Sequence, residues 1–455
     1  MLDKKYVKAG TILLASLSVL ATAGCGAATN GSSSGSTNQT SGTASSGNSA
    51  ASTSGSSNVV NINFWYGVGG NLSDDVQKMV QQFNAAHPNV HVTATYQGSY
   101  SGGGPEQQKL LAALAAGNPP DIAQIEVNSM GVFANSGKLM DLTSFMNQSS
   151  VDNPNNFLKG MLVSTEWNGK YYGVPLNRSV PVLFYNKTLF AKAGIQNPPK
   201  TWDELAADAK KLTSGSGSSK VYGYGPLVDW WPWESMVWSS GSEILSSDMQ
   251  KATFNTPELD RVLSLQQSLV KSGDAYVETG SNYWNLMTAD FIKGKIAMDI
   301  DSIGDAAQVQ QGVGSKFQWG TAYLPSDKTL GVPPGGGDMA IMNGIPSDHV
   351  KAAETFIEWW TAPTQTLEWS KMTGYLPVQQ AAVQDPSYQT YLQQNPQFKT
   401  AIDELQFQKA APASSHLLDV LKYAQQSLQG IFDEGKSVKS EMDQAASQAN
   451  SLLGN

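Results

Sequence analysis

Apolar residues change their spacing along the chain after residue 58. They recur at every second position in residues 60–64 and again in residues 90–96, which predicts two strands. Between these strands they follow a helical period after the capping residue Ser73, and His87-Pro88 ends the pattern. The first part of the folded chain therefore reads as strand, helix and strand.

The same pattern continues over the next thirty residues. Leucines near residues 110–114 have helical spacing, the breakers of residues 117–120 follow, and residues 121–125 form a short apolar run. Alternating strands and helices predict a mostly parallel sheet covered on both faces, and thus an α/β fold. Ligands of such sheets bind beyond the carboxyl ends of the strands. Glu126 and the turn that ends at Tyr100 lie at such ends.

Later segments supply more helices. Residues 201–204 form a capping box, a helix that begins near Ser347 is ended by Pro363, and the last 40 residues carry leucines on one face. About 400 residues follow the N-terminal region, too many for one ordinary domain, so we expect two lobes.

The N-terminus has the features of an export signal. Lysines precede a short apolar run, and residues 1–24 end in small residues before Cys25, the only cysteine in the sequence. We expect residues 1–24 to be a lipoprotein signal peptide and Cys25 to carry the lipid. Residues 25–58 are almost entirely small and polar, which predicts a flexible Ser/Gly/Thr tether.

The charge excludes some partners. The whole chain has 29 Lys and Arg against 38 Asp and Glu. This acidic balance argues against nucleic acid as a partner, and against binding of anionic lipid except through a lipid anchor. One cysteine and four scattered histidines give no metal-ligand spacing, and no cofactor is expected. Twelve Trp and sixteen Tyr supply candidate stacking surfaces.

Three patterns suggest enzymes but lack the right context. Residues 31–35 match a nucleophile elbow inside the polar tether, and residues 430–437 match a P-loop inside an amphipathic helix. Asp299 and Asp301 could serve a glycoside hydrolase, yet residues two apart in a strand are more often structural. We therefore expect a protein that is not an enzyme.

Several ordered blocks carry a family resemblance. They are Phe64-Trp65-Tyr66, the segments 96–100, 116–127, 175–187 and 199–202, and Thr373 to Pro377. In order and spacing the chain resembles the family 1 extracellular solute-binding proteins of ABC importers, and within them the branch that binds sn-glycerol 3-phosphate. The resemblance spans about residues 60–440.

The resemblance implies a set of ligand contacts. The residues at matching positions are Tyr100, Glu126, Ser179, Trp202, Ser302, Gly336, Tyr375 and Lys422. Trp202 would be an aromatic platform beneath the ligand, and Lys422 stands where the family has a phosphate-binding arginine. Arg178 or Lys422 is expected to face an anionic group. Trp230 and the tryptophans that follow it could instead form a cage for a quaternary ammonium, or a subsite for a second sugar.

The resemblance also implies a two-lobe, type II periplasmic-binding-protein-like fold with hinge-crossing strands. The expected first lobe comprises residues 59–178 and 303–362, and the second comprises residues 179–302 and 363–455. We expect a lipid-anchored monomer on the outer face of a bacterial cytoplasmic membrane that delivers its solute to an ABC permease.

The solute stays open between glycerol 3-phosphate, a glycerophosphodiester and a small sugar or neutral oligosaccharide. An extracellular glycoside hydrolase and a surface adhesin are the alternatives from other classes.

Overall fold

The computed structural model describes residues 59–100, 104–280 and 282–454. The expected signal peptide, the lipid-bearing Cys25 and the tether all lie outside the described residues. Within the described ranges, no helix has both the length and the apolar character that crossing a bilayer requires.

The first sheet has five strands in the order β2, β1, β3, β10 and β6. Their bounds are β2 (Val90–Tyr96), β1 (Val60–Tyr66), β3 (Ile122–Glu126), β10 (Gly335–Ile341) and β6 (Val174–Ser179). β1 is parallel to β2 and to β3, as predicted. β10 runs antiparallel to β3 and β6 and makes the sheet mixed. Since β10 comes from a distant segment, local periodicity could not place it.

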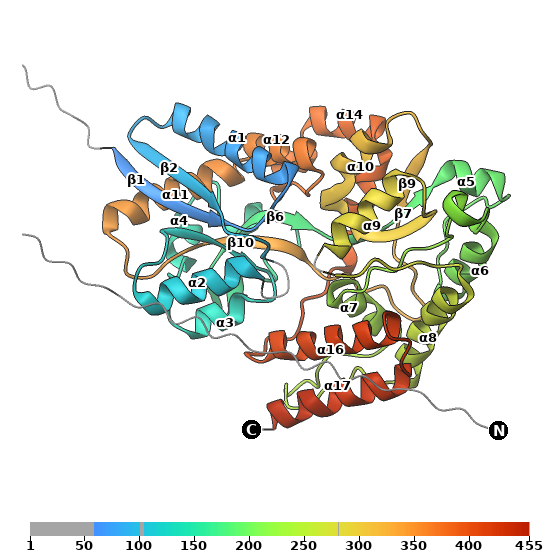
Figure 1. The fold of residues 1–455 in the computed structure, drawn as a ribbon. Coiled ribbons are helices and arrows are strands. Elements are labelled where there is room, and N and C mark those ends of the chain that lie inside the picture. Colours follow the sequence, from blue (N-terminus) through green and yellow to red (C-terminus); the bar gives the residue numbers. More distant parts are fainter. Residues whose placement is uncertain (1–58, 101–103, 281, 455) are drawn as a thin grey trace, which may run out of the picture. The chain divides into compact units, whose positions relative to one another are not determined.

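Helices cover both faces of the first sheet (Figure 1). One face packs on α1 (Asn71–Ala86) and α11 (Ser347–Thr361), where the rings of Phe83 and Phe356 lie edge to face at 5.0 Å. The opposite face packs on α2 (Pro105–Ala116) and α3 (Met130–Asn135) through Leu110 and Phe133. The sheet is therefore buried on both sides, in agreement with its apolar strands.

The second sheet has three antiparallel strands in the order β8, β7 and β9. Their bounds are β8 (Met298–Ser302), β7 (Pro181–Asn186) and β9 (Trp319–Ala322). Neighbouring residues of β7 enter different cores: Phe184 packs with the first and Leu183 with the second. The second core also holds residues of α6 (Trp202–Leu212), α7 (Trp230–Ser239) and α8 (Pro257–Ser272).

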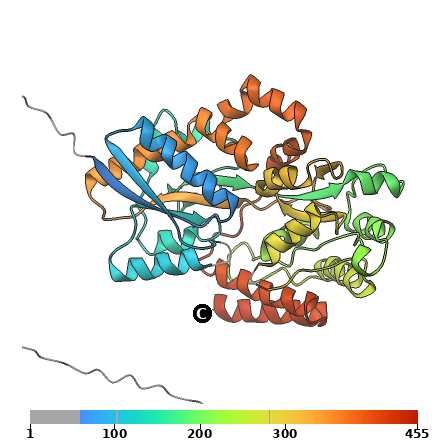
Figure 2. The same cartoon turned by 45° about the horizontal axis from the view of Figure 1, so that its top comes forward.

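The C-terminal helices complete the second core. α16 (Leu417–Phe432) and α17 (Val438–Leu453) lie side by side, as both views show (Figure 2). The P-loop-like residues 430–437 are the end of α16 and the turn before α17, with Gly435 at φ +70° and Ser437 capping α17. No strand precedes them, which agrees with their dismissal as a nucleotide site.

The other elements surround these layers. They are α4 (Thr143–Gln148), β4 (Glu166–Trp167), β5 (Lys170–Tyr171), α5 (Lys187–Lys192), α9 (Tyr283–Ile292), α10 (Ala306–Val313), α12 (Pro363–Thr373), α13 (Gln380–Gln384), α14 (Pro386–Gln394) and α15 (Lys399–Glu404). Short 3-10 helices connect several of them, at Pro154–Asn156, Gly217–Ser219, Ile303–Asp305, Pro396–Phe398 and Leu405–Phe407.

Extended chain passes directly between the two sheets. β6 ends at Ser179, Val180 follows, and β7 begins at Pro181 in the second sheet. The amide of Ile303, just after β8, donates to the carbonyl of Val180 at 3.1 Å. This crossing is where hinge strands were expected.

Two segments differ from the expected lobe boundaries. β9 pairs with β7 in the second sheet, although residues after 303 were assigned to the first lobe. α12 packs against α1 and α11 on the first sheet, although it was assigned to the second lobe. The long-range packing of these two segments leaves no mark in the local sequence pattern.

Candidate ligand-binding site

Three strand ends of the first sheet meet at one edge. In the ladder, Gly337 lies opposite Glu126, Gly336 opposite Arg178, and Gly335 opposite Ser179. The structure thus brings together three residues expected to contact the ligand: Glu126, Ser179 and Gly336. This edge is the carboxyl end of β3 and β6, where ligands of α/β sheets bind.

Gly336 is required by this geometry. Its φ is +94°, and a Cβ added to it would overlap the carbonyl oxygen of Asn177 on β6. A side chain would therefore push β10 away from β6. Glycine here keeps the strand ends close together.

Two tyrosine hydroxyls and an amide form the second part of the site. The Asn177 amide group donates to the Tyr100 hydroxyl at 3.5 Å. Tyr100 and Tyr375 each act on the pKa of the other, which places their hydroxyls close together. Burial raises the pKa of Tyr100 to about 12, so the hydroxyl is neutral and can both donate and accept.

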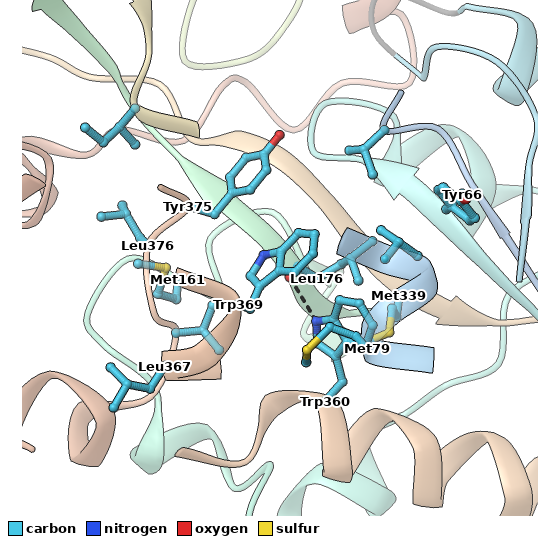
Figure 3. Packing of buried hydrophobic residues seen from close by; sticks show 14 of the residues in the cluster. Tyr66, Met79, Met161, Leu176, Met339, Trp360, Leu367, Trp369, Tyr375 and Leu376 are labelled. Carbon is cyan, nitrogen blue, oxygen red and sulfur yellow. Dashed lines mark hydrogen bonds between the residues drawn. The ribbon is translucent and has the colours of Figure 1, made fainter. Parts of the chain in front are cut away.

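Neighbouring groups hold these side chains. The side-chain oxygen Oδ1 of Asn177 accepts from the side-chain amide of Gln124 at 3.0 Å and from the backbone amide of Gly337 at 3.1 Å. The Tyr375 ring stacks on Trp369 at 5.9 Å with an angle of 3°, and its hydroxyl points away from that packing (Figure 3). Sequence reasoning missed Asn177 and Gln124 as site residues, although both lie in the blocks that carried the resemblance.

Ser302 lies on the far side, close to Tyr375. Its hydroxyl accepts from the Gly304 amide at 3.0 Å, and a Cβ on Gly304 would lie 2.6 Å from the Tyr375 ring. Next in the chain, the Asp305 carboxylate accepts from the Trp284 ring at 3.1 Å. The start of α9 therefore joins the same region.

Glu126 is a buried carboxylate with local support. One oxygen accepts from the backbone amide of Asn128 and from the Ser129 hydroxyl, each at 3.0 Å. Burial still raises the pKa of Glu126 to about 7, although both hydrogen bonds favour the charged form. The carboxyl thus titrates near neutrality and can accept a ligand hydroxyl or donate to one.

An aromatic wall faces the strand ends. A Cβ at Gly335 would overlap both the Ser179 hydroxyl and the Trp231 ring, so both groups lie directly beside Gly335. The Trp231 ring donates to the carbonyl of Pro334 at 2.9 Å and lies 5.8 Å from the Trp284 ring. Trp231 and Trp284 supply the apolar surface that the C–H faces of a polyol prefer.

Comparison with known proteins assigns the family. The family model described as bacterial extracellular solute-binding protein matches residues 78–400. The chain belongs to the bacterial extracellular solute-binding protein family. The two-lobe α/β fold expected from the resemblance is confirmed by solved structures of such proteins.

Named relatives show what this solute-binding protein is similar to. It is 28% identical to the sn-glycerol-3-phosphate-binding periplasmic protein UgpB of Escherichia coli K12, over 87% of this chain and 93% of that protein. UgpB from Mycobacterium tuberculosis, solved with glycerophosphocholine, matches with a TM-score of 0.77 and 26% identity over 86% and 98% of the chains. An ABC transporter solute-binding protein from Thermotoga lettingae, solved with α-D-tagatose, shares the fold at TM-score 0.76 and 20% identity over 87% and 100%.

Trp202 stands apart from the rest of this solute-binding site. Its ring is 1% exposed in the second core, and its N–H donates to the Ser239 hydroxyl at 2.8 Å. Tyr100 and Tyr375 pack with the first core instead. The structure therefore does not place Trp202 beneath a ligand at the strand ends, because its ring and its polar atom are used within the fold.

Trp230 also packs in the second core. Its backbone amide donates to Gln425 of α16 at 2.8 Å. Of the tryptophans in this cluster, Trp231 is the one that meets Ser179 at the strand ends. Trp233 and Trp238 are 0% and 2% exposed and fill the second core.

The two candidate cations differ in their surroundings. Arg178 is 1% exposed; it pairs with Asp338 and donates to the carbonyl of Met161 at 3.1 Å and to Ser164 at 2.8 Å. The Lys422 side chain is exposed on α16 and forms no ion pair or hydrogen bond with the other described residues. The charge of Arg178 is used within the fold, which departs from the expectation that it faces an anionic group. An anion contact of Lys422 stays a prediction.

The paired aspartates are buried in β8. The Asp301 carboxylate accepts from Thr288 and from the Ser302 amide, each at 2.7 Å. Asp299 is buried beside it, and burial raises the pKa of both groups well above the usual range. Both side chains lie within β8, as expected for residues two apart in a strand.

Proposed function

We propose that this protein captures a small hydroxylated solute between its two sheets and delivers it to an ABC permease. The proposed ligands are glycerol 3-phosphate, a glycerophosphodiester or a small sugar. Family membership supports the receptor role, and the named relatives bind solutes of these kinds. The N-terminal pattern around Cys25 supports anchoring on the outer face of the cytoplasmic membrane.

One observation carries the proposal. The hydroxyls of Tyr100 and Tyr375 and the carboxyl of Glu126 converge at the strand ends, beside the ring of Trp231. A polyol needs fixed donors and acceptors around it and an apolar plane beneath it. These four side chains supply both, and Asn177 holds the tyrosine pair in place.

The strands that cross between the two sheets suggest how ligand binding changes the conformation of the protein. Ser302 and Trp284 belong to elements around the second sheet, whereas Glu126 and Ser179 end strands of the first. A solute that contacts both sets favours their approach, because ligand binding shifts a conformational equilibrium only through contacts made in one state. The closed form is then the state that a permease recognises.

A calorimetric titration with the three ligand classes tests the proposal. We expect one class to bind with micromolar affinity, about −8 kcal/mol. Tyr375→Phe, which keeps the stacked ring, should weaken binding about tenfold through loss of one hydroxyl. Intact recovery of the ligand separates a receptor from a glycoside hydrolase. Turnover of the ligand, or absence of binding by all three classes, would refute the proposal.

A further inference from the structure

Three buried carboxyl groups from two elements gather beside the aromatic wall. Glu126 ends β3, Asp229 caps the start of α7, and Glu234 lies one turn into α7. Glu126 and Asp229 both raise the pKa of Glu234, and Asp229 also raises the pKa of Glu126. The three groups are therefore within electrostatic reach of one another.

Glu234 is the group that lacks a partner. Its side chain is completely buried, and neither carboxyl oxygen has a hydrogen-bond partner within the described part of the chain. The side-chain amide of Asn128 lies close enough to favour the charged form of Glu234, but its Nδ2 makes no full hydrogen bond within the described ranges. Buried carboxyl groups are almost always hydrogen-bonded, and the side-chain amide of Asn128 is too distant to satisfy Glu234 fully.

No positive side chain balances these acids. In the described ranges, no lysine or arginine pairs with Glu126, Asp229 or Glu234. The buried Arg178 is already neutralised by Asp338. The site therefore has no positive charge that would oppose a cation, and an entering cation can replace the protons of these carboxyl groups.

Aromatic rings complete the surroundings. Trp231 precedes Glu234 by three residues, so both lie on one face of α7. Asp229 fixes the wall, because its carboxylate accepts from the Trp231 amide at 2.8 Å and from the Tyr283 hydroxyl. Tyr283 is followed by Trp284, whose ring lies 5.8 Å from that of Trp231. Aromatic faces attract organic cations.

We propose that Glu126, Asp229 and Glu234, together with the Trp231–Trp284 pair, receive an ammonium group of the ligand. The solute is then a hydroxylated molecule with a cationic head, and its hydroxyls lie toward Tyr100 and Tyr375. This inference rests on the proposed function and narrows its ligand class. It disfavours glycerol 3-phosphate, which is an anion without a cationic group.

Proton release should accompany binding. The titratable groups that face Glu234 are Glu126 and Asp229, with Tyr283 hydrogen-bonded to Asp229 and Asp338 acting on Glu126. Burial raises the pKa of Glu126 to about 7 and that of Glu234 well above its usual range. A bound cation stabilises the charged carboxylates, so protons leave as the ligand enters.

The experiment compares two probes that differ in charge alone. One is glycerophosphocholine, and the other is its isostere in which a 3,3-dimethylbutyl group replaces choline. We expect the native protein to bind glycerophosphocholine at least about tenfold more tightly. Glu234→Gln should reduce this preference to about threefold or less, while affinity for the isostere stays the same.

A matched control separates charge in the site from the general loss of a buried acid. Glu404 of α15 is also completely buried, and one of its oxygens likewise lacks a partner among the described residues. Its other oxygen accepts from the Leu324 amide at 3.0 Å, on the segment after β9. Glu404→Gln should therefore leave the preference for glycerophosphocholine unchanged.

The outcomes distinguish the inference from the proposed function. Equal affinity for the two probes, or tighter binding of glycerol 3-phosphate or a neutral sugar, overturns the cationic subsite and leaves the receptor role intact. Failure of every solute to bind overturns both. If Glu234→Gln does not fold, calorimetry of the native protein in two buffers of different ionisation enthalpy decides. Proton release with glycerophosphocholine alone supports the inference, and equal release with both probes overturns it.

Discussion

Replacement of Gly336 by alanine tests the geometry on which the site depends. Gly336 has φ +94°, where a residue with a Cβ costs about 1–2 kcal/mol. The new Cβ would also overlap the carbonyl oxygen of Asn177, and β10 would have to move away from β6. Each ladder hydrogen bond lost in that movement costs about 1 kcal/mol. We expect Gly336→Ala to lower the free energy of unfolding by at least about 3 kcal/mol.

Gly344→Ala is the matched control. Gly344 has φ +87°, but no atom lies within 4 Å of the position of its added Cβ. This variant should therefore show the conformational cost alone, about 1–2 kcal/mol. Ligand affinity should fall in Gly336→Ala and stay unchanged in Gly344→Ala, because only Gly336 lies between Glu126 and Ser179.

Urea unfolding followed by tryptophan fluorescence measures both variants, and calorimetric titration measures their affinity. The difference between the two unfolding free energies reports the overlap with Asn177. Equal losses in the two variants would contradict the observed register of β10 against β6.

Three further predictions concern the tryptophans, the buried acid and the buried arginine. Trp202→Phe should lower the free energy of unfolding by about 1–3 kcal/mol and leave ligand affinity unchanged, whereas Trp231→Phe should weaken binding. Urea unfolding and calorimetric titration measure the two effects, and the opposite pattern would refute the prediction. The folded pKa of Glu126, about 7, lies above its usual 4.5, so its stabilising contribution is full below pH 4.5 and is lost as the pH rises to 7. Glu126→Gln should therefore gain up to about 3 kcal/mol relative to the native protein across that window, and parallel stability–pH curves would exclude it. Arg178→Met leaves Asp338 buried without its cation and should lower the free energy of unfolding by about 3–5 kcal/mol. A loss below about 1 kcal/mol in urea unfolding would contradict this prediction.

The sequence predicted the elements whose signals are local. The spacing of residues 60–125 predicted three strands and two helices, and the observed strands begin or end within two residues of those expected. Glu126 and Tyr100 were predicted as site residues because ligands bind where the strands of an α/β sheet end. Neither inference needed a distant partner.

The remaining site depends on contacts that sequence spacing does not show. The partner of Arg178 is Asp338, 160 residues away, so its neutralised charge could not be seen. Trp202 and Trp231 are both tryptophans near helix starts; what distinguishes them is that Ser239 satisfies the ring of Trp202 inside the core, whereas Trp231 meets Ser179. Residue type indicated aromatic binding surfaces but could not decide which ring was available.

A crystal structure of the protein with glycerophosphocholine bound would show where each part of the ligand lies. We expect the glycerol hydroxyls within hydrogen-bond distance of Tyr100 and Tyr375, and the ammonium group against Glu234 and the Trp231 ring. Ligand density against Trp202 or beside Lys422, with the edge at Ser179 empty, would contradict it.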